Sequence, residues 1–178
     1  MTKAIQRLQL FYSKLGGNGG KPADVPSLRQ ICLSSVGAMV GVGSLTAMHQ
    51  LTGGTDATLL VASSGATAVL LFAAPALPFS QPRNVVGGHL LAASSGILTH
   101  TALGAEFVGS PAVAVGLTVF GMLATSCVHP PAGGTAIVAA TASPFVIVPI
   151  FITSVAQISV ACLWHNASTD GRRYPQYW

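Results

Sequence analysis

The sequence predicts an all-α membrane protein: a bundle of about five transmembrane helices, with a short half-helix or re-entrant segment and two breaks at proline and glycine motifs. The first observation is charge, because only 7% of the residues are charged, against about a quarter in soluble proteins. The second is a series of apolar runs, most of them near the roughly 20 residues that a helix needs to cross a bilayer. The mean hydropathy of +0.63 agrees. An ordinary soluble domain is therefore excluded.

Residues 1–28 are predicted to be a basic cytoplasmic segment and linker. In a helix, one face would be apolar, with Ile5, Leu8 and Phe11, while Lys3 and Arg7 would lie on the others. This pattern is typical of a short amphipathic helix on a membrane surface. Lys and Arg are enriched in cytoplasmic segments, so we expect the N-terminus in the cytoplasm, in contact with anionic lipid.

The predicted transmembrane domain, residues 29–165, contains five apolar runs: 31–48, 57–77, 85–103, 111–128 and 144–164. The segment 132–143 is too short to cross, because a helix of that length reaches about 18 Å. Five crossings would place the polar C-terminal tail, 166–178, outside the cell with Arg172 and Arg173, against the positive-inside tendency. Either the short segment is also a crossing, or this basic pair is outweighed.

Small residues are frequent in the runs, and in lipid they let helices approach closely. Gly37 and Gly41 form the clearest pair, which indicates either packing inside the bundle or a subunit contact. The three cysteines, at positions 32, 127 and 162, are isolated. Their spacing suggests neither a metal site nor a disulfide framework. The basic residues cluster at the two tails, so we do not predict nucleic-acid binding.

Two motifs stand out, QPRNVVGGH at 81–89 and HPPAGGT at 129–135. In both, a polar residue precedes proline, a glycine pair follows, and an apolar run resumes. Proline is favoured at the first position of a helix, so each motif is interpreted as a break followed by a helix start. Such a start presents free N–H groups and partial positive charge, which suits an anion. Discontinuous transporter helices use this arrangement.

We therefore predict an anion site made by two facing half-helix starts. One half has Arg83, Asn84, Gly87, Gly88 and His89, and the other His129, Gly133, Gly134 and Thr135; Pro82, Pro130 and Pro131 form the breaks.

Simpler roles stay open for the three main candidates. Arg83 suits a cytoplasmic loop charge that fixes topology, His129 a helix cap, and His89 an interior histidine bonded to a neighbouring serine or carbonyl. No second ionisable residue accompanies either histidine at helical spacing, so the sequence gives poor support to a proton relay or a metal site. Asp56 and Glu106 are interpreted as external loop acids.

At these same residues the chain resembles the HPP family of integral membrane proteins, named for its His-Pro-Pro signature. The resemblance rests on HPPAGGTA at 129–136 and PALPFSQPRNVVGGHLL at 75–91, and extends over about 31–164. It implies four or five membrane helices. Members studied in plastids and cyanobacteria resemble nitrite transporters, which implies a small anion as the substrate.

The favoured function is therefore a transporter or channel for a small inorganic anion, most of all nitrite, in a bacterial-type inner membrane. Nitrate, formate, bicarbonate or chloride would suit the same chemistry. The alternative is a membrane subunit that binds or senses through a partner protein. An enzyme is not expected, because Cys127 near His129 is the only candidate nucleophile and no carboxylate accompanies it. We expect no cofactor. We expect a homo-oligomer, and a dimer is the guess for its size.

Overall fold

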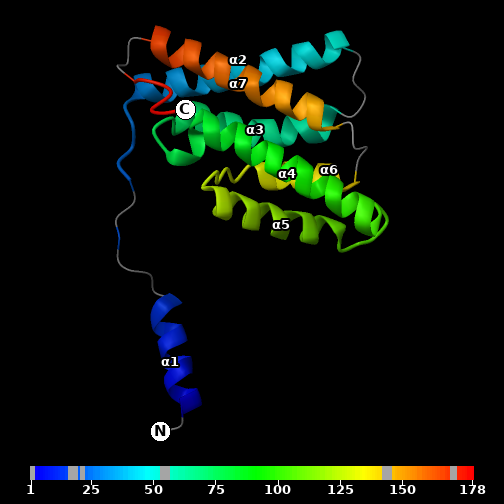
Figure 1. The fold of residues 1–178 in the computed structure, drawn as a ribbon. Helices are drawn as coiled ribbons and strands as arrows, with labels where there is room; N and C mark the ends of the chain where they lie inside the picture. The colour runs from blue at the N-terminus through cyan, green and yellow to red at the C-terminus, as the bar shows by residue number, and fades with distance from the viewer. Residues whose placement is uncertain (1–2, 16–19, 21–22, 53–56, 142–145, 169–171) are drawn as a thin grey trace.

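The computed structural model describes residues 3–15, 20, 23–52, 57–141, 146–168 and 172–178. The side chains of residues 4 and 48–62 also lie outside this description. The described residues form seven α-helices and one 3-10 turn and contain no strand, so the predicted all-helical fold is confirmed (Figure 1). The helices are α1 (Lys3–Leu15), α2 (Leu28–Thr52), α3 (Ala57–Ala73), α4 (Pro82–Leu103), α5 (Ser110–Thr125), α6 (Ala132–Thr141) and α7 (Ile147–Ala167), and the turn is η1 (Pro78–Ser80).

Helix α1 stands apart from the other helices (Figure 1). Its predicted apolar residues Ile5, Leu8 and Phe11 are each about half exposed or more, at 47%, 58% and 58%. The predicted amphipathic helix is therefore present and its apolar side chains are uncovered. Its contact with a membrane surface stays a prediction.

Helices α2 to α7 run alternately in opposite directions. Arg83 at the start of α4 bonds to the carbonyl of Thr125 at the end of α5. Near the end of α7, His165 Nε2 lies 2.8 Å from the carbonyl of Leu71, near the end of α3. The end of α6 meets the end of α4, where His100 Nδ1 lies 3.2 Å from the carbonyl of Ala140. The parallel pair α4 and α6 is thus separated in the chain by the returning helix α5.

The start of α2 and the end of α7, where the chain enters and leaves the bundle, therefore lie on the same side. The start of α2 and the segment after α7 are joined by Arg172, whose guanidinium donates to Ser34 Oγ at 3.2 Å. We call this side the basic end; it holds Arg29, Arg83, Arg172 and Arg173. Glu106 lies at the opposite end, between α4 and α5. Asp56, the other predicted external acid, lies outside the described residues.

The count of about five membrane helices is not confirmed. Within the part of the chain that the structure describes, two helices are long and apolar enough to cross a membrane alone, at Leu28–Ala47 and Ile147–Ala167. Three other apolar helices are shorter, at Ser63–Ala73, Ser110–Thr125 and Ala132–Thr141. The predicted half-helix is present as α6, with 10 residues. Because α6 runs back from the basic end after α5, α7 runs toward that end again, and the C-terminal tail lies there.

Two predicted runs end early for local reasons. The run 111–128 is helical only to Thr125, because Ser126 adopts a left-handed conformation with φ 55°. The run 57–77 is helical only to Ala73, and a turn and η1 then lead to Gln81. Proline at position 75 has no N–H to continue the helix. These two early ends shape the breaks that precede α6 and α4.

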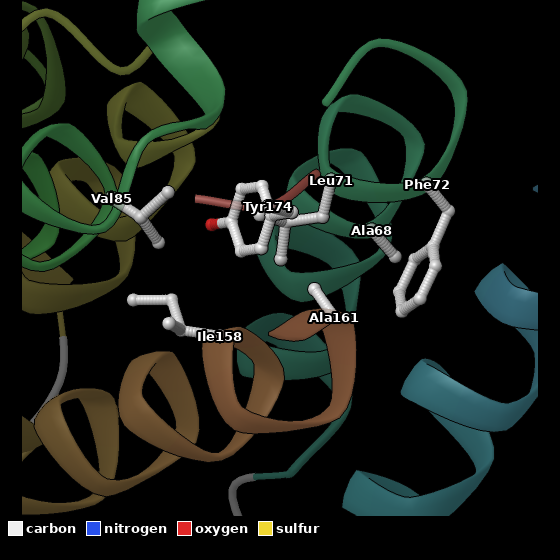
Figure 2. Close-up of a cluster of buried hydrophobic side chains, with 7 residues drawn as sticks. All are labelled: Ala68, Leu71, Phe72, Val85, Ile158, Ala161 and Tyr174. Carbon is white, nitrogen blue, oxygen red and sulfur yellow. The ribbon is translucent and has the colours of Figure 1, made fainter. Parts of the chain in front are cut away.

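One hydrophobic cluster of the core lies between α3, α4 and α7, with one residue from the C-terminal tail (Figure 2). The tail residue is Tyr174, which is 1% exposed although it follows the last helix. Its hydroxyl donates to the carbonyl of Ser80 at 2.7 Å. The side chain of Gln81, fully buried, donates to the carbonyls of Pro75 and Leu77 and accepts from the Gln176 amide. The tail thus holds the break before α4.

Helix α2 packs on the same core through its glycines. A Cβ atom on Gly37 would lie 2.6 Å from Phe72 Cδ1 and 2.7 Å from Trp164 Nε1. A Cβ atom on Gly41 would lie 2.6 Å from Phe72 Cε2. Of the two interpretations of this glycine pair, packing inside the bundle is therefore the one that the structure supports.

Candidate functional site

The two predicted motifs meet inside the bundle. After α5 ends at the basic end, residues 126–131 lead inward without helical structure, and α6 begins there beside α4. Close approach depends on Gly88, where a Cβ atom would lie 2.6 Å from His129 Cβ. Gly87 accommodates Cys127 in the same way, with its sulfur 3.0 Å from the Cβ position. The glycine pair of the first motif therefore makes room for the second motif.

The helix starts themselves are different from the prediction. In the first turn of α6, the amides of Ala132, Gly133 and Gly134 donate to the carbonyls of residues 129, 130 and 131 at 3.0 to 3.1 Å. In α4, the amides of Asn84 and Val85 both donate to the carbonyl of Gln81 at 2.9 Å. The prediction of free N–H groups is wrong for these amides, because tight local turns already use them.

What the breaks bring together is a set of buried side chains. We call it the histidine cluster: Ser63, Thr67, His89, His129 and Thr135. Ser63 is 7% and His89 4% exposed, and Thr67, His129 and Thr135 are fully buried. The ring centroids of the two histidines are 4.9 Å apart. Three helices, α3, α4 and α6, and the segment before α6 each contribute to it.

Hydrogen bonds join all five members. Thr67 Oγ1 lies 3.1 Å from His89 Nε2 and 3.0 Å from His129 Nε2. His89 Nδ1 lies 2.8 Å from Thr135 Oγ1, which is 3.0 Å from Ser63 Oγ. The chain of contacts ends at a main-chain group, because His129 Nδ1 lies 2.7 Å from the carbonyl of Phe79.

The direction of these bonds follows from what each group can donate. A carbonyl only accepts, so His129 Nδ1 must donate to Phe79, and in a neutral ring Nε2 then accepts from Thr67. Thr67 has one hydroxyl hydrogen, so it accepts from His89 Nε2. His89 Nδ1 in turn accepts from Thr135, and Thr135 accepts from Ser63. In the neutral cluster the two imidazoles are therefore different tautomers. Every hydrogen bond is donated in the same direction along the series, from Ser63 to the Phe79 carbonyl.

Arg83 lies apart from these bonds. Its guanidinium donates to the carbonyls of Thr125 and Ser126, at 2.8 and 3.1 Å, and the residue is exposed. It thus caps the end of α5, where main-chain carbonyls carry partial negative charge. It also lines an apolar groove of about 710 Å³ between α4 and α7, bordered by Trp178. A guanidinium has five N–H donors, so donors remain for a ligand at the basic end.

Asn84 is placed between Arg83 and the cluster but is committed to the main chain. Its amide nitrogen donates to the carbonyl of Val128 at 3.0 Å. Its oxygen Oδ1 is buried and has no hydrogen-bond partner among the described residues. An amide oxygen accepts and does not donate. Asn84 in this conformation therefore supports the break rather than offering a donor to an anion.

The remaining predicted residues have simple positions. Pro82 occupies the first turn of α4, and Pro130 and Pro131 form the turn into α6. Gly134 packs loosely on Ser63, and a Cβ atom on Gly133 would meet nothing within 4 Å. The structure thus brings together His89, His129 and Thr135, with Gly88 beside them, and leaves Arg83 at the basic end.

Sequence reasoning missed Thr67, the residue that joins the two histidines. The signal available was its spacing, because Thr67 follows Ser63 by one helical turn in an apolar run and shares its face. The importance of the histidine pair was also underestimated from the sequence. Each histidine has the other as its second ionisable group, close in space although not at helical spacing. In the described part of the chain, no group of three or more His, Cys, Asp or Glu side chains is placed to hold a metal ion.

The chain is similar to known membrane proteins over most of its length. Residues 23–175 match the family described as HPP, transmembrane region. Two curated relatives, both transmembrane proteins of Dictyostelium discoideum, are each 31% identical to this chain. The matches cover 98% and 96% of this chain but 60% and 64% of the relatives, so the chain spans about three fifths of their length. No solved structure matches.

Proposed function

We propose, from the premise that this chain belongs to the HPP transmembrane family, that it transports a small inorganic anion across a membrane, with nitrite as the preferred substrate. The protein is an integral membrane protein by its family and by the names of its relatives. Anion transport and nitrite go beyond those names.

The observation that carries the proposal is the histidine cluster. Ionisable side chains inside a membrane domain are costly, and they mark substrate or ion pathways. Here two imidazoles and three hydroxyls are buried at the point where a pass through the bundle is broken. Transporters place substrate sites at such discontinuous helices. The imidazole N–H groups and hydroxyls are donors that can exchange their present acceptors within the cluster for the two oxygens of nitrite.

The charges of the bundle support an anion rather than a cation. Four arginines lie at the basic end, while Glu106 lies at the opposite end. A surface of one sign raises the local concentration of ions of the other sign. Arg83 is the arginine next to the break, six residues before His89 on α4, which is about 9 Å along the axis. We propose that an anion meets Arg83 first and the cluster second.

The same charges give an orientation. By the positive-inside tendency, the basic end faces the cytoplasm, which places α1 and the tail there too. The proposed location is a bacterial-type inner membrane. Assembly as a homo-oligomer, with a dimer as its simplest form, stays a prediction. Catalysis is not proposed, because Glu106 and Asp24, the carboxylates on the described residues, are both outside the helices that form the cluster.

Uptake by liposomes tests this function. The full chain is reconstituted, and nitrite uptake is measured at alkaline pH, where leakage of neutral nitrous acid is suppressed. We expect saturable uptake that is lost in Arg83→Gln and partly kept in Arg83→Lys, which retains the charge without the planar fork.

Two outcomes would overturn the proposal in different places. Unchanged uptake in a folded Arg83→Gln protein would remove Arg83 from the pathway. A folded protein that takes up none of nitrite, nitrate, formate, bicarbonate and chloride would overturn transport itself and favour a subunit that acts through a partner protein.

A further inference from the structure

Thr67 has more hydrogen-bond partners than its hydroxyl can serve in a neutral cluster. Its oxygen lies 3.1 Å from the carbonyl of Ser63, 3.1 Å from His89 Nε2 and 3.0 Å from His129 Nε2. The hydroxyl has one hydrogen, and with neutral rings both the Ser63 carbonyl and His129 Nε2 are placed to accept it. One of the three contacts is then unmet. All three are met only when both Nε2 atoms carry hydrogen.

We propose that the histidine cluster is a binding site for one exchangeable proton, which adds to His129 Nε2, and that this proton is carried with the anion. The second part rests on the proposed transport function, and the first part does not.

The binding step changes one hydrogen bond. Hydronium in the surrounding water gives one proton to the Nε2 lone pair of His129 and becomes water, and His129 becomes an imidazolium with net charge +1. The Thr67 hydroxyl hydrogen turns from His129 to the Ser63 carbonyl, and the Thr67 oxygen then accepts from both Nε2–H groups. His129 continues to donate to Phe79 through Nδ1. No other bond in the cluster has to break, so the hydrogen bonds adjust to one added proton by one hydroxyl rotation.

Proton addition at His89 is less well accommodated. His89 Nδ1 would have to donate to Thr135 Oγ1, so Thr135 would lose its acceptor and turn toward Ser63 Oγ, which would lose its own. Two hydroxyls must turn instead of one. The geometry therefore favours His129.

The charge of the bound proton gives the coupling. His129 is fully buried, and a lone buried charge is strongly disfavoured unless it is paired. A monoanion beside the imidazolium makes the pair neutral, so each ligand stabilises the other. The expected stoichiometry is one proton to one anion.

No other charge stands in for that anion on the elements around the rings. The titratable or charged side chains there are Arg83 and His100 on α4, Cys127 before α6, and Cys162 and His165 on α7. The described residues of α3, α5, α6 and η1 carry no carboxylate or charged group. A countercharge to the imidazolium must therefore come from a ligand.

Nitrogen NMR tests proton binding without any transport. The full chain is labelled with 15N-histidine in lipid nanodiscs, and signals are assigned with single histidine variants. At alkaline pH we expect hydrogen on Nδ1 of His129 and on Nε2 of His89, and on acidification one added proton on the pair, at His129. Thr67→Val should lower the proton affinity of His129 by roughly tenfold or more, because it removes a hydrogen bond to a charged group.

Thr118→Val is the matched control. Thr118 is equally buried, but its hydroxyl donates to Ala114 within its own helix α5, so the same change should leave both rings unaffected. The opposite tautomers in folded protein, or two protons or none taken up by the pair, would overturn the proton site.

Coupling is tested in liposomes with the membrane potential clamped, where the lumenal pH is followed during nitrite uptake and empty liposomes give the leak. We expect lumenal acidification in step with uptake, lost in Thr67→Val and kept in Thr118→Val. Saturable uptake without acidification would overturn coupling but leave the anion pathway standing. Absence of all uptake beside intact proton binding would overturn the transport function alone.

Discussion

The histidine cluster and the contact of α2 with the core are built on opposite principles. In the contact of α2, which we call the glycine contact, Gly37 and Gly41 lie against Phe72 and Trp164, with no room for a Cβ atom. In the histidine cluster, hydroxyls and imidazoles fill the space and bond to one another. The first excludes side chains, and the second requires particular ones.

This contrast indicates which region holds the helices together and which region serves the proposed transport. Close packing holds helices together in lipid, where there is no hydrophobic drive between them. Buried polar networks mainly specify one arrangement of side chains, because a member without its partner is costly. We therefore expect changes in the glycine contact to affect folding and changes in the cluster to affect transport.

The largest expected effect is in the glycine contact. Gly41→Leu would push a side chain into the Phe72 ring, since even a Cβ atom would lie 2.6 Å from it. Overpacking of this kind costs about 1 to 3 kcal/mol, occasionally more, and we expect loss of folded protein, measured by thermal unfolding in detergent. Gly43→Leu is the control on the same helix, because its Cβ position is open. Equal melting temperatures for the two variants would show that the contact does not hold α2.

A smaller change tests the cluster. Gly88→Ala would place a Cβ atom 2.6 Å from His129 Cβ and 3.2 Å from the Cys127 carbonyl, so the segment before α6 must move. We expect nitrite uptake to fall by roughly tenfold or more, because a shift of about 1 Å in a positioned group can cost that much, while most protein stays folded. Gly133→Ala, also at a motif glycine but with open space, should retain uptake. Normal uptake by Gly88→Ala would contradict the role of the close approach.

The smallest effect concerns Tyr174, which lies in the dry core yet bonds to Ser80, the neighbour of Phe79. Tyr174→Phe removes that bond at constant shape and should cost about 1 kcal/mol of unfolding free energy without changing uptake. Burial raises the pKa of the Tyr174 hydroxyl. The stabilisation is therefore complete below the ordinary tyrosine pKa of about 10 and is lost as the pH rises above it. The melting temperatures of the two proteins should differ at neutral pH and should converge at strongly alkaline pH.

If the wild type is more stable than Tyr174→Phe by the same amount at strongly alkaline pH as at neutral pH, this linkage is contradicted. A loss of uptake in Tyr174→Phe would connect the tail to the histidine cluster through residues 79 and 80, and so weaken the separation between the two regions.

Much of the architecture was predictable because it depends on local composition. The scarcity of charge identified a membrane protein, the glycine pair identified a close helix contact, and the proline and glycine motifs identified the breaks before α4 and α6. The half-helix was predictable from length alone. Each of these features depends on residues that are close together in the sequence. A single proline is enough to break a helix, and a pair of glycines is enough to allow a close helix contact.

The number of passes and the partners of the site residues were decided only by the tertiary structure. The broken segment at 126–131 lets α6 run back from the basic end, and α7 then brings the arginines of the tail to the side of the other basic residues. Arg83 bonds to carbonyls more than forty positions away, and Thr67 to a histidine sixty-two positions away. Contacts at such separations depend on which helix faces which, and no local pattern in the sequence encodes that choice.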